Sequence, residues 1–407
     1  MKHYLLFRLP VLRTSILMLL LMPMQARAEG QIDLKPYVAA SLTYDDNLFR
    51  LAGQDQARIV LGSDAMSDRV TRTEAGINVD WKISRQHLRL ELNLNQNRYD
   101  RFGFLDNDGS NKKIAWDWSV GNHLNGELSM TEGISMGGFS EIHNPVLNQQ
   151  TNTLRLMSLN WDFHPSWRLH LQHDETDFLN SLASYKSSDR NDVAQELALQ
   201  YSTPGGNHIG LSARETKTEY PGRDSFSTVV FGNSNRQRDL ALNVMWQPAG
   251  KTRIDGRLAL VERKYDELKQ RDVTDWAGRV SLDWQATGKT ALQATVEHTI
   301  SPIEDKAATY VQTDRVTLSP AWTATEKISV QGSLAYESSS YLGDPGFVLG
   351  GAPLREDKVK TVGLVVSYKP YDKVQTQLSV QKSKRDSSVA ANSYETNSIN
   401  VNVRFDF

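Results

Sequence analysis

A serine between two glycines is the first candidate for catalysis. The stretch Gly133-Ile134-Ser135-Met136-Gly137 matches the G-x-S-x-G pattern of a nucleophile elbow. In that elbow, a sharp turn from a strand into a helix exposes and activates the serine. Here a glycine-containing loop follows a strand-like stretch in place of a helix. We therefore expect a strand end, no catalytic residue and no enzyme activity, because a motif without its structural context is weak.

Three polar clusters could hold a metal ion. His170, His173 and Asp174 resemble a ligand set, but strand residues three apart point to opposite faces. Asp45-Asp46-Asn47 could bind a divalent cation at a loop mouth, although a solvated strand end explains the same residues. The stretch Asp106-Asn107-Asp108-Gly109-Ser110 has turn chemistry and lacks the remaining ligands of a calcium loop. We expect no metal and no cofactor.

The composition excludes several classes of protein. Of the 407 residues, 39% are hydrophobic and 23% are charged, which excludes a helical membrane protein. The net charge of -2 offers no basic field for nucleic acid, so we expect no nucleic-acid partner. The chain contains no cysteine, which removes disulfides, thiolate metal sites and thiol nucleophiles.

The first segment determines the compartment. Lys2, Arg8 and Arg13 precede an apolar run, and Ala26-Arg27-Ala28 fits a signal-peptidase site. A retained anchor is the alternative, but the run is shorter than the roughly 20 residues that a membrane helix needs. We predict a cleaved signal peptide over residues 1–28 and one domain over residues 29–407.

Apolar residues recur at every second position through most of that domain. The alternation is plain in residues 88–95, 114–120, 239–246, 279–284 and 399–407. A period of two predicts β-strands with one apolar and one polar face. Residues 154–161 break the phase, which predicts a β-bulge.

Short connections alternate with long polar ones. The long ones lie near residues 52–68, 102–110, 136–150, 175–190, 218–234, 265–272, 301–311, 340–356 and 384–393. Outer-membrane barrels have tight periplasmic turns and longer outer loops, whereas a soluble sandwich has no reason to alternate them. The fold class predicted is all-β, a transmembrane antiparallel up-and-down barrel of about 18 strands, with 16 as the alternative and both termini in the periplasm.

Aromatic residues recur beside the short turns and the C-terminus, where a membrane interface places them. This predicted periplasmic aromatic girdle comprises Trp81, Trp118, Trp161, Trp167, Trp246, Trp284, Trp322, Tyr368 and Phe405. Scattered core tryptophans would not recur at the same end of successive hairpins.

Both ends of the domain resemble known outer-membrane sequences. Pro36-Tyr37-Val38 and Tyr44-Asp45-Asp46-Asn47-Leu48-Phe49-Arg50-Leu51 resemble the EpsL family of exopolysaccharide-biosynthesis outer-membrane proteins, found at exosortase-associated polysaccharide loci of Gram-negative bacteria. The ending Val403-Arg404-Phe405-Asp406-Phe407 is similar to the signature that the barrel-assembly machinery recognises, with Phe407 as the assembly signal. The resemblance implies a β-barrel in the outer membrane and no catalytic residues.

The polar phase of the strands is rich in charge. The residues predicted to line the lumen are Glu74, Asp80, Lys82, Arg89, Glu91, Asp117, Glu127, Arg168, Glu196, Arg214, Asp255, Arg257, Arg279, Asp283, Glu297 and Arg404. Opposite charges can pair across neighbouring strands. A barrel of about 16 to 18 strands encloses an aqueous channel unless something plugs it. Mixed charges and amides would suit a hydroxyl-rich, weakly charged polymer.

Three functions fit these observations. The first is an outer-membrane conduit that exports an exopolysaccharide, and the second is a general or sugar-uptake porin. The third is a non-conducting structural component of the export apparatus. The expected partners are outer-membrane lipid and lipopolysaccharide, the barrel-assembly machinery, the polysaccharide, and periplasmic and inner-membrane secretion proteins.

Overall fold

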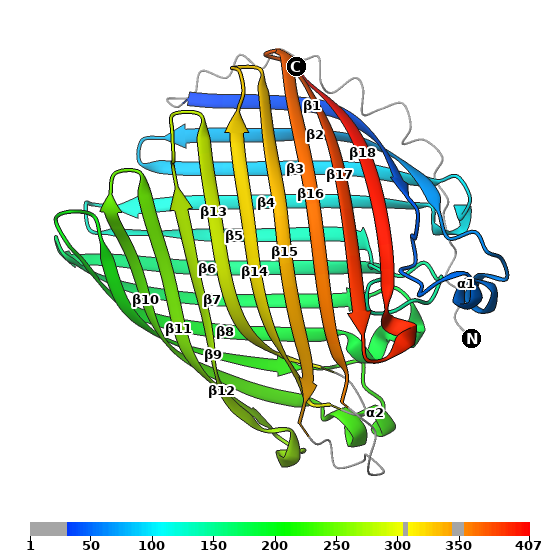
Figure 1. The fold of residues 1–407 in the computed structure, drawn as a ribbon. Helices are drawn as coiled ribbons and strands as arrows, with labels where there is room; N and C mark the ends of the chain where they lie inside the picture. The colour runs from blue at the N-terminus through cyan, green and yellow to red at the C-terminus, as the bar shows by residue number, and fades with distance from the viewer. Residues whose placement is uncertain (1–30, 304–307, 344–353) are drawn as a thin grey trace, which may run out of the picture.

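The computed structural model describes residues 31–303, 308–343 and 354–407. Within them, eighteen antiparallel strands form one sheet in which each strand pairs with its neighbour in sequence (Figure 1). The first strand also pairs with the last, so the sheet closes into a barrel. The strands are β1 (Gln31–Asp45), β2 (Asp68–Ile83), β3 (Gln86–Tyr99), β4 (Asn107–Val120), β5 (Leu124–Met136), β6 (Gln149–His164), β7 (Trp167–Asn180), β8 (Arg190–Ser202), β9 (His208–Glu219), β10 (Ser234–Ala249), β11 (Thr252–Tyr265), β12 (Val273–Trp284), β13 (Thr290–Pro302), β14 (Tyr310–Thr323), β15 (Ile328–Leu342), β16 (Glu356–Tyr371), β17 (Val374–Ser387) and β18 (Tyr394–Asp406). The predicted fold class is confirmed, with 18 strands rather than 16.

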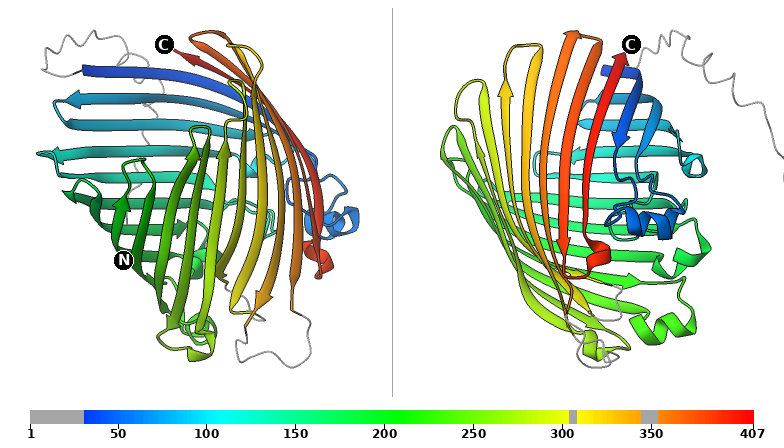
Figure 2. Two further views of the ribbon diagram at one scale, coloured as in Figure 1. Left: turned by 60° about the vertical axis from the view of Figure 1, so that its left-hand side comes forward. Right: turned by 45° about the vertical axis from the view of Figure 1, so that its right-hand side comes forward.

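The two ends of the barrel differ in their connections. At the turn end, strands are joined by short segments such as Ser84-Arg85, and Ser84 has a positive φ of 55° that a tight turn requires. At the loop end lie the long connections, which carry helices α1 (Gln54–Leu61) and α2 (Ser225–Phe231) (Figure 2). The N-terminal end of β1 and the C-terminal end of β18 both lie at the turn end (Figure 1). The assignment of that end to the periplasm remains a prediction, and the predicted signal peptide lies outside the described residues.

The outer face carries the apolar phase of each strand. Leu240 is 60% exposed, Leu258 55% and Val296 57%, because these side chains point away from the barrel. Large exposed apolar side chains on every strand except β2 match a surface that contacts lipid. No helix among the described residues is long and apolar enough to cross a membrane.

Two local expectations were wrong. The predicted bulge near residues 154–157 is absent, because β5 and β6 keep one register from Leu124 to Met136. Leu154 and Leu156 instead occupy the inward phase, and the register shift lies between Trp161 and His164, beside the turn. The stretch predicted as a turn at 106–110 is mostly strand, since β4 begins at Asn107 and only Asp106 precedes it.

Ser135 of the G-x-S-x-G stretch lies inside β5, and the connection that follows contains no helix. Its surroundings are therefore those of a strand end and not of a nucleophile elbow. His170 and His173 point to opposite faces of β7, and Asp174 pairs with Arg214 at 2.7 Å. No group of three or more His, Asp or Glu side chains among the described residues is arranged to hold a metal ion.

Candidate functional site

The predicted lumen residues all occupy the strand phase opposite the exposed apolar side chains, and most of them take part in an ion pair. On β2 to β5 they form a chain, because His87 lies 2.8 Å from Asp80 and 3.3 Å from Asp117. Arg89 then joins Asp117 at 2.7 Å to Glu127 at 3.4 Å. Four of these five groups were predicted from the sequence; the fifth, His87, was not, although it lies on β3 two residues before Arg89 and on the same phase.

The remaining predicted charges make smaller pairs. Glu74 bonds with Arg72, Arg168 with Asp162, Asp255 with Arg253, Arg214 with Asp174 and Glu196, Arg404 with Asp406, and Asp283 accepts from Gln293. Lys82 and Glu91 have no ion pair within 4.0 Å among the described residues. Local pairing therefore neutralises much of the inward-facing charge.

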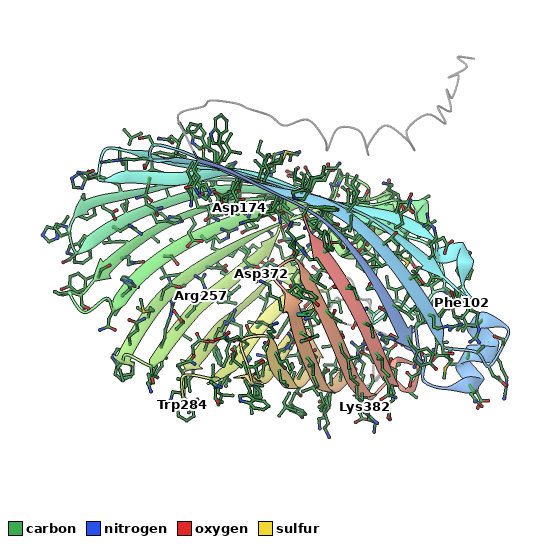
Figure 3. The ribbon with its side chains drawn as sticks, turned by 90° about the horizontal axis from the view of Figure 1, so that it is seen from above. Phe102, Asp174, Arg257, Trp284, Asp372 and Lys382 are labelled. Carbon is green, nitrogen blue, oxygen red and sulfur yellow. The ribbon has the colours of Figure 1, made fainter. Side chains whose placement is uncertain are left out.

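A row of charges crosses β11 to β15 at one level, and we call it the charged wall: Arg257, Arg279, Glu297, Arg315 and Glu337. Arg279 lies 3.4 Å from Glu297, and Arg315 pairs with Glu337. Arg257, which is labelled in Figure 3, is the cross-strand partner of Arg279 and has no ion pair among the described residues. It donates instead to the Asn243 amide oxygen at 3.1 Å. The charged wall therefore has one arginine in excess.

Asparagines line the other side, and we call this surface the amide wall: Asn93, Asn95, Asn97, Asn111 and Asn152. On β3 their side chains form a ladder, since the Asn97 amide donates to Asn95 at 3.1 Å and Asn95 donates to Asn93 at 3.2 Å. Asn93 donates in turn to the Tyr37 hydroxyl at 2.7 Å. The Tyr37 ring lies against Gly76, where a Cβ would meet the ring at 2.5 Å.

Each wall borders its own cavity. The cavity beside the charged wall has a volume of about 820 Å³ and is lined by Arg168, Glu196, Asp255, Arg257, Arg279 and Asp283, among others. The cavity beside the amide wall has a volume of about 740 Å³ and includes all five asparagines together with Glu74 and Glu91. The inner space thus presents a charged surface and a mostly neutral one.

The segment that resembles the EpsL family folds into a turn at the loop end of β1. Asp45 accepts hydrogen bonds at 2.9 and 2.8 Å from Arg50, whose φ is +57°. The Asn47 side chain makes two hydrogen bonds with the backbone of Leu51. Its amide oxygen accepts from the Leu51 N–H at 2.9 Å, and its amide nitrogen donates to the Leu51 carbonyl at 2.8 Å. These residues therefore stabilise a turn, and the charge of Asp45 is balanced by Arg50 rather than left for a cation.

That turn contributes to a small hydrophobic core outside the barrel wall, which we call the rim cluster: Phe49, Leu51, Ala57, Phe102, Leu105 and Phe139. Phe49 makes edge-to-face contacts with Phe102 at 4.8 Å and with Phe139 at 4.6 Å between ring centroids. Three connections, β1–β2, β3–β4 and β5–β6, meet there (Phe102 is labelled in Figure 3). The rim cluster packs these connections into one body.

The connection between β5 and β6, residues 137–148, reaches farther, and we call it the strap. Its Glu141 carboxylate pairs with Arg385 and, at 3.2 Å, with Arg355. Arg385 also donates to the Ser140 carbonyl at 2.7 Å. Arg385 lies on β17, and β1 to β4 and β18 separate it from β5 in the wall. The strap thus links two distant parts of the loop-end rim.

A buried carboxylate holds the two arginines in place. Asp357 is 2% exposed and lies 2.5 Å from Arg355 and 3.8 Å from Arg385. Burial acts to lower the pKa of Arg355, but the hydrogen bond to Asp357 and nearby negative charges raise it above its ordinary value. Arg355 therefore stays charged and available to Glu141. Nothing in the local sequence marks Glu141, which lies 214 residues from Arg355.

The predicted girdle residues all lie near the turn end. Trp246 is 51% exposed, Trp284 45% and Trp322 52%, on the outward phase (Trp284 is labelled in Figure 3). Trp81 and Trp118 are less exposed. Their place at the periplasmic interface remains a prediction, as does the role of Phe407, whose N–H donates to the Pro36 carbonyl at 3.0 Å.

Comparisons with known proteins agree with this architecture. Residues 258–407 match the family described as Putative beta-barrel porin 2. No curated protein matches the sequence. The fold is similar to that of a BenF-like porin from Pseudomonas fluorescens Pf-5, with a TM-score of 0.52, 9% identity, and 92% of this chain and 99% of that chain covered. It is also similar to that of the outer membrane protein opdK from Pseudomonas aeruginosa, with a TM-score of 0.51, 9% identity and the same coverage.

The comparisons do not return the EpsL family, which therefore remains a hypothesis. At 9% identity, the similarity to these two solved structures supports the fold alone. A closed barrel with an apolar outer face and a polar inner face is a fold that typically carries no catalysis. The chain is a porin-like β-barrel protein of the Gram-negative outer membrane.

Proposed function

We propose that this barrel is a conduit through which an exopolysaccharide leaves the periplasm. The observation that carries the proposal is the ladder of asparagine amides along β3, which ends on the Tyr37 hydroxyl. An amide both donates and accepts, so it can replace water at a sugar hydroxyl in either direction. The resemblance of residues 36–51 to the EpsL family supports the same assignment.

A polymer that passes the amide wall needs weak contacts at many positions. Neutral amides meet this need, because a hydrogen bond exchanged with water contributes only about 0.5–1.5 kcal/mol. Conduction requires such weak, repeated binding rather than one strong site. Paired charges elsewhere on the lumen favour neutral or weakly charged chains over strong polyanions.

The energy and the polymer would come from partners. The described chain is almost entirely barrel wall and connections, with two short helices. We propose that an inner-membrane synthase or flippase and a periplasmic adaptor deliver the polysaccharide to the turn end. Lipopolysaccharide and the barrel-assembly machinery complete the expected partners.

One observation favours a second candidate, an uptake porin for small anions. Arg257 and Arg279 stand directly opposite each other, and of the two only Arg279 has an ion pair among the described residues, with Glu297. Like charges on facing strands destabilise a sheet unless an anion or a carboxylate offsets them. The strap favours a third, a non-conducting structural component, because it links the rim across several strands.

Deletion of the gene tests the three functions together. We expect extracellular polysaccharide to be abolished or sharply reduced while growth on small nutrients is unchanged. Purified barrel in a planar bilayer should conduct, and the cognate polymer should reduce the current. Normal polymer with impaired uptake of an anionic nutrient would support the porin. Loss of polymer without any measurable current would support the structural role.

A further inference from the structure

The outer face of β9, β10 and β11 carries three cations in one row. Lys217 is the cross-strand partner of Arg236, and Arg236 is the partner of Lys264. All three occupy the outward phase, since Leu211 and Leu240 on the same faces are 60% exposed. Cations that face one another on three adjacent strands repel, so this row destabilises the bare sheet.

Nearby carboxylates offset only part of that charge. Glu219 lies 2.5 Å from Lys217, and Glu262 lies 2.6 Å from Lys264. Glu215 is shared between Arg238 at 2.7 Å and Arg236 at 3.6 Å. The row and Arg238 therefore form a cluster of four cations and three carboxylates, with one positive charge in excess. Both guanidinium groups can donate to the oxygens of a phosphate.

Other outward cations are arranged differently. Lys112 stands directly opposite Glu132, and Arg155 directly opposite Glu175. Each cation there faces an opposite charge, which is the usual stabilising arrangement across strands. Lys360 and Lys384 also face each other on β16 and β17, but neither strand lines the apolar groove described next. The row on β9 to β11 combines facing cations with such a groove.

The groove runs along the outer face of the wall from β4 to β12. It has a volume of about 1520 Å³ and is lined by apolar side chains that include Trp116, Met157, Leu171, Leu197, Leu240 and Leu260. Glu215, Arg238 and Glu262 border it at the loop end. An amphiphile with acyl chains in this groove would therefore place an anionic head group at the cation row.

We propose that this surface is a binding site for a phosphorylated lipid of the outer leaflet, with phosphate at Lys217, Arg236, Arg238 and Lys264 and acyl chains in the groove. Two phosphates on one lipid suit a cluster that spans three strands better than one phosphate does. The site lies toward the loop end, which we predict to be in the outer leaflet, where lipid A is the phosphorylated lipid. It rests on that orientation of the barrel and is independent of the conduit function.

The test uses the full chain, purified and exchanged into micelles that contain one lipid at a time. Bound lipid is counted by native mass spectrometry with bis-phosphorylated lipid A, monophosphorylated lipid A or phosphatidylglycerol. The triple variant Lys217→Gln, Arg236→Gln, Lys264→Gln should bind bis-phosphorylated lipid A at least about tenfold more weakly than wild type. Monophosphorylated lipid A should bind wild type less tightly than the bis-phosphorylated form.

A matched control removes three other outward cations, Arg69→Gln, Lys112→Gln and Arg155→Gln. Their side chains are 63%, 49% and 45% exposed, against 48%, 48% and 56% for Lys217, Arg236 and Lys264. The control should retain lipid A as wild type does. Equal loss in the control would reduce the site to non-specific charge and overturn the proposal.

Three further outcomes would also overturn it. Unchanged lipid A binding in the triple variant would remove the cation row from the site. Phosphatidylglycerol bound as tightly as lipid A would contradict the outer-leaflet assignment, and displacement by millimolar inorganic phosphate would indicate a free-anion site. If the triple variant does not fold, the single change Arg236→Gln supplies the same comparison, with a smaller loss of lipid A expected.

Discussion

The amide wall and the charged wall border the same lumen, but they satisfy their polar groups in opposite ways. Each asparagine of the ladder bonds with the next one along its own strand, and Asn93 then bonds with the Tyr37 hydroxyl on β1. The arginines of the charged wall need carboxylates from neighbouring strands, and Arg257 finds none among the described residues. A neutral surface can thus link most of its polar groups along one strand, whereas a charged one depends on the register between strands.

This difference has a functional meaning. Amides change partners at little cost in free energy, so the amide wall offers many equivalent contacts to a passing hydroxyl-rich chain. The charged wall acts over a longer range, because unpaired charge creates a potential in the lumen. We expect the amide wall to determine polymer binding and the charged wall to determine ion selectivity.

The largest expected effect separates the outer face from the amide wall itself. Leu90→Arg should destabilise the barrel by about 2 to 4 kcal/mol, because Leu90 faces lipid between Val79 and Ile114. Asn93→Arg should cost little, since its side chain faces the polar lumen beside Tyr37. Urea unfolding of the two variants in lipid vesicles measures the difference. Equal losses would show that the two faces are assigned wrongly.

Removal of two rungs of the ladder should affect polymer rather than ions. The pair Asn95→Ala and Asn97→Ala should weaken block of the current by the cognate polysaccharide by roughly thirtyfold, since each of the two lost hydrogen bonds contributes about 1 kcal/mol. The reversal potential in a salt gradient should stay at the wild-type value. Unchanged block would remove the amide wall from the proposed polymer path.

Charge reversal on the charged wall should affect ions rather than polymer. Arg257→Glu together with Arg279→Glu should shift the preference of the pore toward cations severalfold, because both side chains line the same cavity. The protein should still run faster on gels unheated than boiled, since a closed barrel resists unfolding. A reversal potential equal to that of wild type would contradict the assignment of selectivity to this wall.

The smallest effect concerns the strap. Glu141→Gln should raise the single-channel current by less than about twofold, because it weakens the tie to Arg355 and Arg385 without removing the rim cluster. Glu132→Gln is the control, since Glu132 faces outward and pairs with Lys112. Equal increases from both changes would mean that the strap does not restrict the mouth.

Much of the architecture was predictable because each strand of a barrel shows the alternation of apolar and polar residues within its own sequence. Alternation such as that of residues 88–95 reports one strand without reference to any other. The amide wall was visible in the same stretch, yet only charged residues were singled out, because an asparagine opposite leucine is equally typical of a solvated face. The phase break at Leu154 and Leu156 was misinterpreted, since apolar residues are also tolerated on the inward phase beside a cavity.

Contacts between distant segments were not predictable. Glu141 meets Arg385 across 244 positions of sequence, and the cation row exists only because three strands share one register. The segment at residues 44–51 was recognised as a family resemblance, but its Asp45–Arg50 pair and its place in the rim cluster depend on a positive φ at Arg50. A pairwise contact needs both partners in place, and one strand's pattern contains only one of them.

Because β1 pairs with β18, the barrel can close only after the last strand has been synthesised. The Cα partners at the seam run from Tyr37 with Asp406 to Asp45 with Ser398, so the first strand to be translated has to wait for the last. A ribosome that stops before β18 releases a chain with two open edges, which invite pairing with other chains. Closure between β1 and β18 therefore requires the full set of strands. We expect truncated chains to be degraded by periplasmic proteases rather than inserted into the membrane.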